Sequence, residues 1–115
     1  MHRTREPFWW SLFAAGGAVA ALLAPVQIAL TGIVAARGWA GHSLTYDRAL
    51  ALVSHPLSRL YLLAFISLPL FHWAHRFRFT LIDLGLGWGR GVVAAVCYGA
   101  AVVCTILAAF VLIRL

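Results

Sequence analysis

The chain has 115 residues, of which 63% are hydrophobic, and its full charges are nine arginines and three acids. A soluble domain carries roughly 25% charged residues, against 10% here, so the composition excludes a soluble enzyme and indicates that lipid covers much of the surface. The arginines stand singly between apolar runs, whereas a nucleic-acid groove needs a clustered basic patch. We therefore expect one membrane-anchor domain, residues 1–115, that binds no nucleic acid.

A first transmembrane helix is predicted over residues 8–36. No charged residue lies from Pro7 to the end of this range. About 20 apolar residues suffice to cross a bilayer, so the run is also too long for a cleaved signal peptide. Trp9 and Trp10 follow its start, as aromatic residues do at a membrane interface. Pro25 lacks the amide hydrogen that a helix interior needs and should kink the helix.

Small residues form a stripe on this first helix. They recur every fourth position from Gly16 through Ala20 to Ala24, and Gly17 begins a second such pattern. Small residues at this spacing let two helices approach closely in a membrane. We therefore expect a partner helix to pack against Gly16 and Gly17.

The stretch over residues 37–56 is predicted as a loop, because glycine and proline punctuate it. Its middle, residues 44–55, contains apolar residues suited to a helix that lies on a membrane surface. Ser43 or Thr45 can cap such a helix at its start. We expect a short interfacial helix here, between the first and second membrane spans.

Two further transmembrane helices are predicted over residues 57–84 and 91–113. Gly85 should end the first of these, because glycine readily adopts the backbone conformation that closes a helix. Pro69 should kink it. The last helix is free of charge up to Arg114 and is long enough to cross with some tilt. The predicted fold class is therefore an all-α membrane protein with three transmembrane helices.

The arginines give a direction to these spans, because cytoplasmic loops carry an excess of basic residues. Three spans place the N-terminus and the turn between the second and third spans on one side of the membrane. That side has five of the nine arginines, which favours a cytoplasmic N-terminus. The arginines on this side are Arg3, Arg5, Arg76, Arg78 and Arg90, and those on the other are Arg37, Arg48, Arg59 and Arg114.

The second span contains a cluster of side chains that can bind a ligand. His72, His75 and Arg76 share one helix face, and ionisable residues at membrane depth usually face a partner or a cavity. Histidine carries protons near neutral pH and arginine hydrogen-bonds anionic oxygens, while the Trp10 N–H can donate to a carbonyl. Trp10, His75 and Arg76 are therefore candidates for binding a quinone head group. The alternative is that they only anchor the helices at the interface.

Haem is the other use of a membrane histidine. His72 or His75 can supply one axial ligand, but the chain has no opposing histidine at matched depth on another span, so a haem would need a histidine from a partner. A metal site is not predicted, because these two histidines have no carboxylate or cysteine nearby. No residue of the chain is predicted to be catalytic.

Several short motifs follow one another along the chain. They are Glu6-Pro7-Phe8-Trp9-Trp10-Ser11-Leu12-Phe13, Gly16-Gly17, Ala24-Pro25-Val26, Leu44-Thr45-Tyr46-Asp47-Arg48, Arg59, Leu68-Pro69-Leu70, His75-Arg76 and Asp83-Leu84. In their order and spacing the chain resembles the D subunit of bacterial quinol:fumarate reductase, one of two small hydrophobic anchors of a four-subunit complex. The third span matches that family only in hydrophobicity.

The resemblance implies a non-catalytic anchor that attaches a flavoprotein and an iron–sulfur subunit to the inner membrane, together with a second anchor. It implies a shared menaquinone site on the cytoplasmic side, to which Trp10, His75 and Arg76 correspond. It also implies that the chain binds no haem and that flavin and iron–sulfur clusters belong to partners. Beyond His75-Arg76 the chain departs from its relatives, with Arg78 between two phenylalanines where they can carry further histidines. Two alternatives stay open: a haem-carrying anchor of succinate dehydrogenase type, and a small membrane accessory protein without a redox role.

Overall fold

The computed structural model describes residues 6–39 and 41–115, and every regular element among them is helical. The first long segment is helical without a break from Pro7 to Ala35, close to the predicted range 8–36. It consists of α1 (Glu6–Ala18), a π-helical turn (Val19–Leu23), α2 (Ala24–Ile28) and further π-helical turns (Ala29–Ala35).

Pro25 leaves this segment helical but alters the turn before it. That turn is π-helical, and the N–H of Ala24 donates to the carbonyl of Val19, five residues earlier. Because proline has no amide hydrogen, the regular α-helical bonding pattern cannot pass through it. A wider turn is one of the ways in which a helix absorbs this defect.

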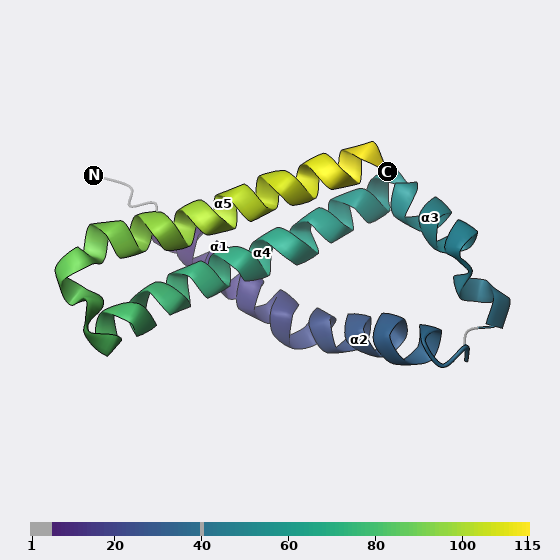
Figure 1. Ribbon diagram of the computed structural model, residues 1–115, viewed down its shortest axis with the longest axis horizontal. Helices are drawn as coiled ribbons and strands as arrows, with labels where there is room; N and C mark the ends of the chain where they lie inside the picture. Colours follow the sequence, from purple (N-terminus) through teal and green to yellow (C-terminus); the bar gives the residue numbers. More distant parts are fainter. Residues whose placement is uncertain (1–5, 40) are drawn as a thin grey trace.

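The other two long helices are α4 (Pro56–Leu81) and α5 (Arg90–Arg114), which lie side by side and antiparallel (Figure 1). Residues 82–89 join them through a π-helical and a 3₁₀ turn, in which Gly85 has a φ of 109°. This is the left-handed region that favours glycine. Gly85 thus closes the second long helix as predicted, although regular α-helix stops at Leu81. α4 continues through Pro69.

A short helix, α3 (Tyr46–Ser54), lies between the first segment and α4, as predicted. Thr45 stands at its N-cap position without a side-chain hydrogen bond, and the side chain of Ser43 lies outside the described ones. α4 begins at Pro56, where the N–H of Leu57 donates to His55 Nδ1 over 3.2 Å. The hydroxyl of Ser54 donates to the backbone oxygen of Leu115 over 3.2 Å, which ties the C-terminus to this end of the molecule.

Small side chains hold α4 and α5 together. Ala74 on α4 packs with Val93, Cys97 and Ala101 on α5, and these four form the buried core. Small residues let membrane helices approach closely, where dispersion contacts are strongest. The predicted glycines on the first helix, by contrast, pack against this chain's own α4.

α1 crosses α4 at Gly16, which is buried. A Cβ atom added at Gly16 would meet the carbonyl oxygen of Leu68 and lie 2.9 Å from the Cβ of His72. One added at Gly17 would lie 2.8 Å from the imidazole Cε1 of His72. The predicted close helix contact at these glycines is therefore present, but the helix that fills it is α4 of the same chain and not a helix of a partner. Beyond the crossing, α2 diverges from α4 (Figure 1).

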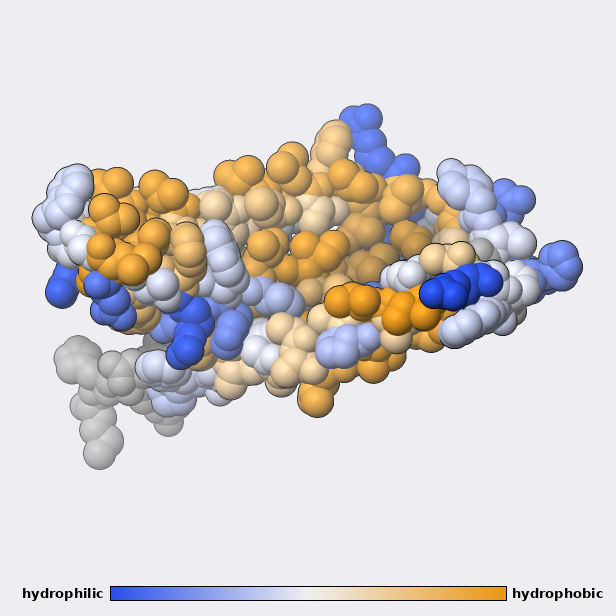
Figure 2. Space-filling model, turned by 60° about the horizontal axis from the view of Figure 1, so that its bottom comes forward, coloured by the Kyte–Doolittle hydropathy of each residue, from blue (hydrophilic) through white to orange (hydrophobic). Residues whose placement is uncertain are grey.

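The surface is apolar over most of its area. Figure 2 shows orange apolar side chains across the middle of the molecule, with most blue hydrophilic side chains toward its left and right and one blue group projecting at its top. Two helical segments, Pro7–Ala35 and Pro56–Arg114, are long and apolar enough to cross a membrane, and the second contains both α4 and α5. Exposed apolar surface of this extent indicates a membrane protein.

Candidate functional site

A cavity of about 520 Å³ lies where the three long helices meet. α1 contributes Trp9, Leu12 and Phe13, which share a face because they are three and four residues apart. α4 contributes Phe71 and His75, again four apart, and α5 contributes Tyr98. The walls are therefore aromatic and apolar, and their polar groups are one imidazole, one phenol and the indole N–H of Trp9.

His75 is the best-connected polar residue of the cavity. Its Nδ1 shares a hydrogen bond of 2.7 Å with the hydroxyl of Tyr98. Its ring lies edge to face with Phe13, with 4.7 Å between ring centroids, and with Phe79, at 5.2 Å. Within the described part of the chain, Nε2 has no hydrogen-bond partner. The imidazole is thus held by one nitrogen and by two aromatic rings, which leaves the other nitrogen for a ligand.

His72 has a different role, one turn earlier on α4. Its Nδ1–H donates to the carbonyl of Phe13 over 3.0 Å, and its ring stacks on that of Phe13 with 4.3 Å between centroids. The edge of the ring at Cε1 and Nδ1 lies against Gly17. His72 therefore joins α4 to α1.

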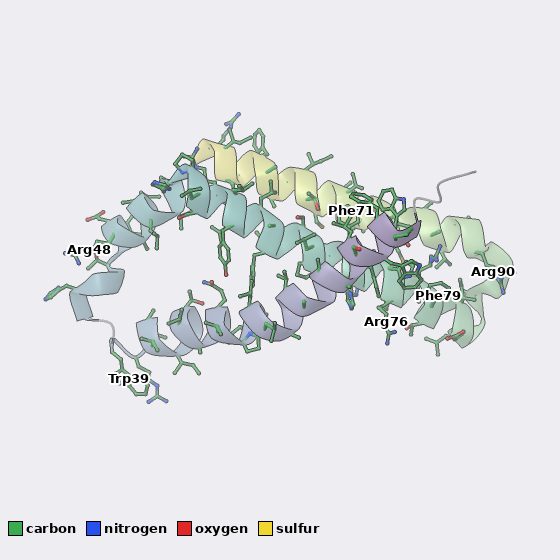
Figure 3. The ribbon with its side chains drawn as sticks, turned by 180° about the vertical axis from the view of Figure 1, so that it is seen from behind. Trp39, Arg48, Phe71, Arg76, Phe79 and Arg90 are labelled. Atoms are coloured by element: carbon green, nitrogen blue, oxygen red, sulfur yellow. The ribbon has the colours of Figure 1, made fainter. Side chains whose placement is uncertain are left out.

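The structure brings together two of the three predicted ligand-binding residues. The indole of Trp10 lies edge to face with His75, at 5.9 Å between centroids, but it is 60% exposed and forms no wall of the cavity. Arg76 is exposed and points away from the helices (Figure 3). Trp10 and His75 are neighbours, and Arg76 stands apart from the cavity.

The sequence interpretation missed Phe13, Phe71 and Tyr98. Phe71 lies four residues before His75, and Phe13 four after Trp9, so helical spacing could have indicated both. Tyr98 had no such signal, because it reaches the site from α5, 23 residues farther along the chain.

Comparison with known proteins identifies the family of the chain. The family model for the D subunit of fumarate reductase matches residues 1–113. This chain belongs to the fumarate reductase D subunit family. The D subunit of fumarate reductase from Mycobacterium bovis (strain BCG / Pasteur 1173P2) is 44% identical over 115 residues, which cover 98% of this chain and 90% of the relative. That of Shewanella sp. (strain W3-18-1) is 39% identical over 114 residues, covering 98% and 93%. The family that the motifs predicted is confirmed.

This member of the fumarate reductase D subunit family carries an arginine beside the cavity. The guanidinium carbon of Arg78 lies 4.5 Å from the ring centroid of Phe79 and 5.5 Å from that of Tyr98. Its Nε is buried and has no hydrogen-bond partner among the described residues. A cation over aromatic faces is attracted by their quadrupoles. Arg78, rather than Arg76, is thus the arginine in contact with a residue of the cavity wall.

Proposed function

We propose that this chain is a non-catalytic membrane anchor of a fumarate reductase complex. With a second anchor it attaches the flavoprotein and iron–sulfur subunits to the bacterial inner membrane. Flavin and iron–sulfur clusters belong to those partners, and this chain holds no haem. Membership of the fumarate reductase D subunit family supports the proposal, and so does the apolar surface, which suits lipid and neighbouring helices.

The anchor has three spans in this proposal, as one domain over residues 1–115. α4 and α5 have 26 and 25 residues, or roughly 38 Å each at 1.5 Å per residue. A hydrocarbon core of about 30 Å is shorter than either. α3 then lies at the outer interface, and the N-terminus and residues 82–89 lie in the cytoplasm. Arg3 and Arg5, which contribute to the charge bias, lie outside the described residues.

Deleting the chain tests its role as an anchor. Membranes from cells without it should lose the flavoprotein to the soluble fraction, while the soluble subunits keep fumarate reduction with a dye donor. A flavoprotein that remains on the membrane in normal amount would contradict the proposal.

The cavity beside His75 is the observation that supports a menaquinone site. Its volume of about 520 Å³ falls in the range of small-molecule sites, roughly 300–1,000 Å³, which are mostly apolar with a few polar groups. The aromatic walls suit a flat ring system, and His75 Nε2 is free to hydrogen-bond an oxygen at its edge. The residues present therefore fit a naphthoquinone head group.

Menaquinol, when bound, supplies electrons to the iron–sulfur partner and releases protons. His75 binds its oxygen and takes up a proton at Nε2. The N–H of Trp10 donates to an oxygen from the mouth of the cavity. Arg76 contributes a positive charge at the surface, next to His75 in the sequence. The aromatic rings exclude water from the head group.

The substitution His75→Leu tests the quinone site. A hydrogen bond of about 1.5 kcal/mol corresponds to roughly a tenfold change, so menaquinol-dependent fumarate reduction should fall about tenfold. Reduction with a soluble dye should stay near normal, because the dye delivers electrons without the membrane site. His42→Leu is the matched control, because His42 is exposed and lies in the 3₁₀ turn Gly41–Leu44, far along the chain from the cavity residues. Equal loss in the two assays, or no loss, would remove the quinone site and leave an anchor alone.

A further inference from the structure

Tyr98 lies on α5, and none of the sequence motifs links this helix to His75 on α4. The two side chains share a hydrogen bond of 2.7 Å, and both line the cavity. The position of Tyr98 is fixed by its neighbours on α5, because Cys97 and Ala101 are buried against α4, with 2% and 0% exposure. The bond is therefore built into the packing of α4 on α5.

A partner on Nδ1 decides what Nε2 can do. In a neutral imidazole one nitrogen carries the hydrogen and the other accepts. When the Tyr98 hydroxyl donates to Nδ1, Nε2 carries the hydrogen and donates to a carbonyl oxygen. When Nδ1–H donates to the Tyr98 oxygen, Nε2 is bare and accepts from a hydroxyl. A phenol suits both arrangements, because its oxygen both donates and accepts.

We propose that Tyr98 is a positioning residue that orients His75 and, by donating or accepting in their shared hydrogen bond, stabilises either tautomer, so that Nε2 binds both the carbonyl and the hydroxyl form of a quinone oxygen. The inference rests on the proposed quinone site. Metal-binding histidines show the same physical logic, since a partner on the second nitrogen fixes the ring and its tautomer. Arg78, stacked on the ring of Tyr98, and Phe79, against His75, hold the pair from the side.

Tyr98→Phe tests this inference, because it removes the hydroxyl and keeps the ring. The whole complex is purified, and binding of a hydroxyquinoline N-oxide, a fluorescent quinone analogue, is titrated by quenching. Loss of one hydrogen bond between neutral groups should weaken binding about three- to tenfold. Tyr61→Phe is the matched control, since Tyr61 stacks on Phe65 and is 42% exposed; it should bind the analogue normally.

A double variant separates positioning from packing. In the His75→Leu background, Tyr98→Phe should cause no further loss, because Tyr98 acts only through His75. The infrared carbonyl band of ¹³C-labelled menaquinone in the complex should shift in Tyr98→Phe toward its position in His75→Leu. The inference would be overturned if the double variant bound the analogue more weakly than His75→Leu alone, or if the carbonyl band were unchanged in Tyr98→Phe.

The failure of the inference and the failure of the quinone site give different results. Normal analogue binding by Tyr98→Phe, with weakened binding by His75→Leu, would reject the role of Tyr98 and keep the site. Normal binding by His75→Leu would reject both.

Discussion

The contact of Gly16 with α4 gives a graded prediction about stability. In Gly16→Ala the new methyl group meets the backbone of Leu68 and lies 2.9 Å from His72 Cβ. Ordinary contacts of a Cβ atom are 3.4–4 Å, so α1 must move away from α4 by roughly 0.5–1 Å, since backbone atoms cannot rotate aside. Overpacking of this kind typically costs about 1–3 kcal/mol.

Two other glycines complete the series. In Gly17→Ala the new methyl meets the ring of His72, which can turn aside and lose its bond to Phe13, so we expect a smaller cost of about 1 kcal/mol. In Gly32→Ala the nearest atom, on Ile28, is 3.8 Å away. That variant should be neutral or slightly stabilising, because alanine favours a helix over glycine.

Thermal unfolding of the purified complex in detergent measures this order. The midpoint temperature should fall most for Gly16→Ala, less for Gly17→Ala and not at all for Gly32→Ala. Because Phe13 lies one turn from the crossing, Gly16→Ala should also weaken binding of the quinone analogue. Equal midpoints for Gly16→Ala and Gly32→Ala would refute the reasoning, since the two differ only in what the methyl group meets.

Two further predictions concern the arginines and the topology. Arg78→Gln should weaken analogue binding about two- to tenfold, because a cation–π contact contributes about 0.5–1 kcal/mol when exposed and more when desolvated, and Arg76→Gln should weaken it less. A larger loss in Arg76→Gln would restore the assignment made from sequence. In a background lacking Cys97 and Cys104, a cysteine placed at Ser43 should react with an impermeant maleimide only from the outer side of the membrane. Reaction only from the cytoplasmic side would invert the topology.

The positions of the first and last long helices could be predicted from the sequence because each coincides with a long uncharged run, whereas α4 has a shorter uncharged run between Arg59 and Arg76. The turn at Gly85 was predictable too, since few other residues adopt a φ of 109°. The short helix α3 was predictable from the apolar residues in its stretch, although Thr45 at its N-cap position makes no side-chain hydrogen bond. These features depend on neighbours along the chain, which a sequence displays directly.

The contacts between helices were harder to predict from the sequence. Small residues mark a face for close packing, but they do not identify the neighbour, and Gly16 turned out to face α4 of the same chain. Arg76 and Arg78 differ by two positions, which is about 200° around a helix, so they lie on nearly opposite faces. Which of them is near the cavity depends on which face of α4 packs against the other helices, and the sequence does not specify this. Tyr98 depends on the register of α5 against α4, which no local pattern specifies.

The crossing at Gly16 also divides the first helical segment into two parts, which would move by different amounts if the segment rotated about the crossing. From Gly16 to Ala35 the helix extends roughly 25–30 Å, whereas Phe13 lies only about 5 Å from the pivot. A rotation of about 10° around the crossing therefore displaces Ala35 by roughly 5 Å and Phe13 by less than about 1 Å. The end of the segment at Ala35 can therefore adjust to the protein or lipid beside it, while Phe13 stays almost in place beside His75.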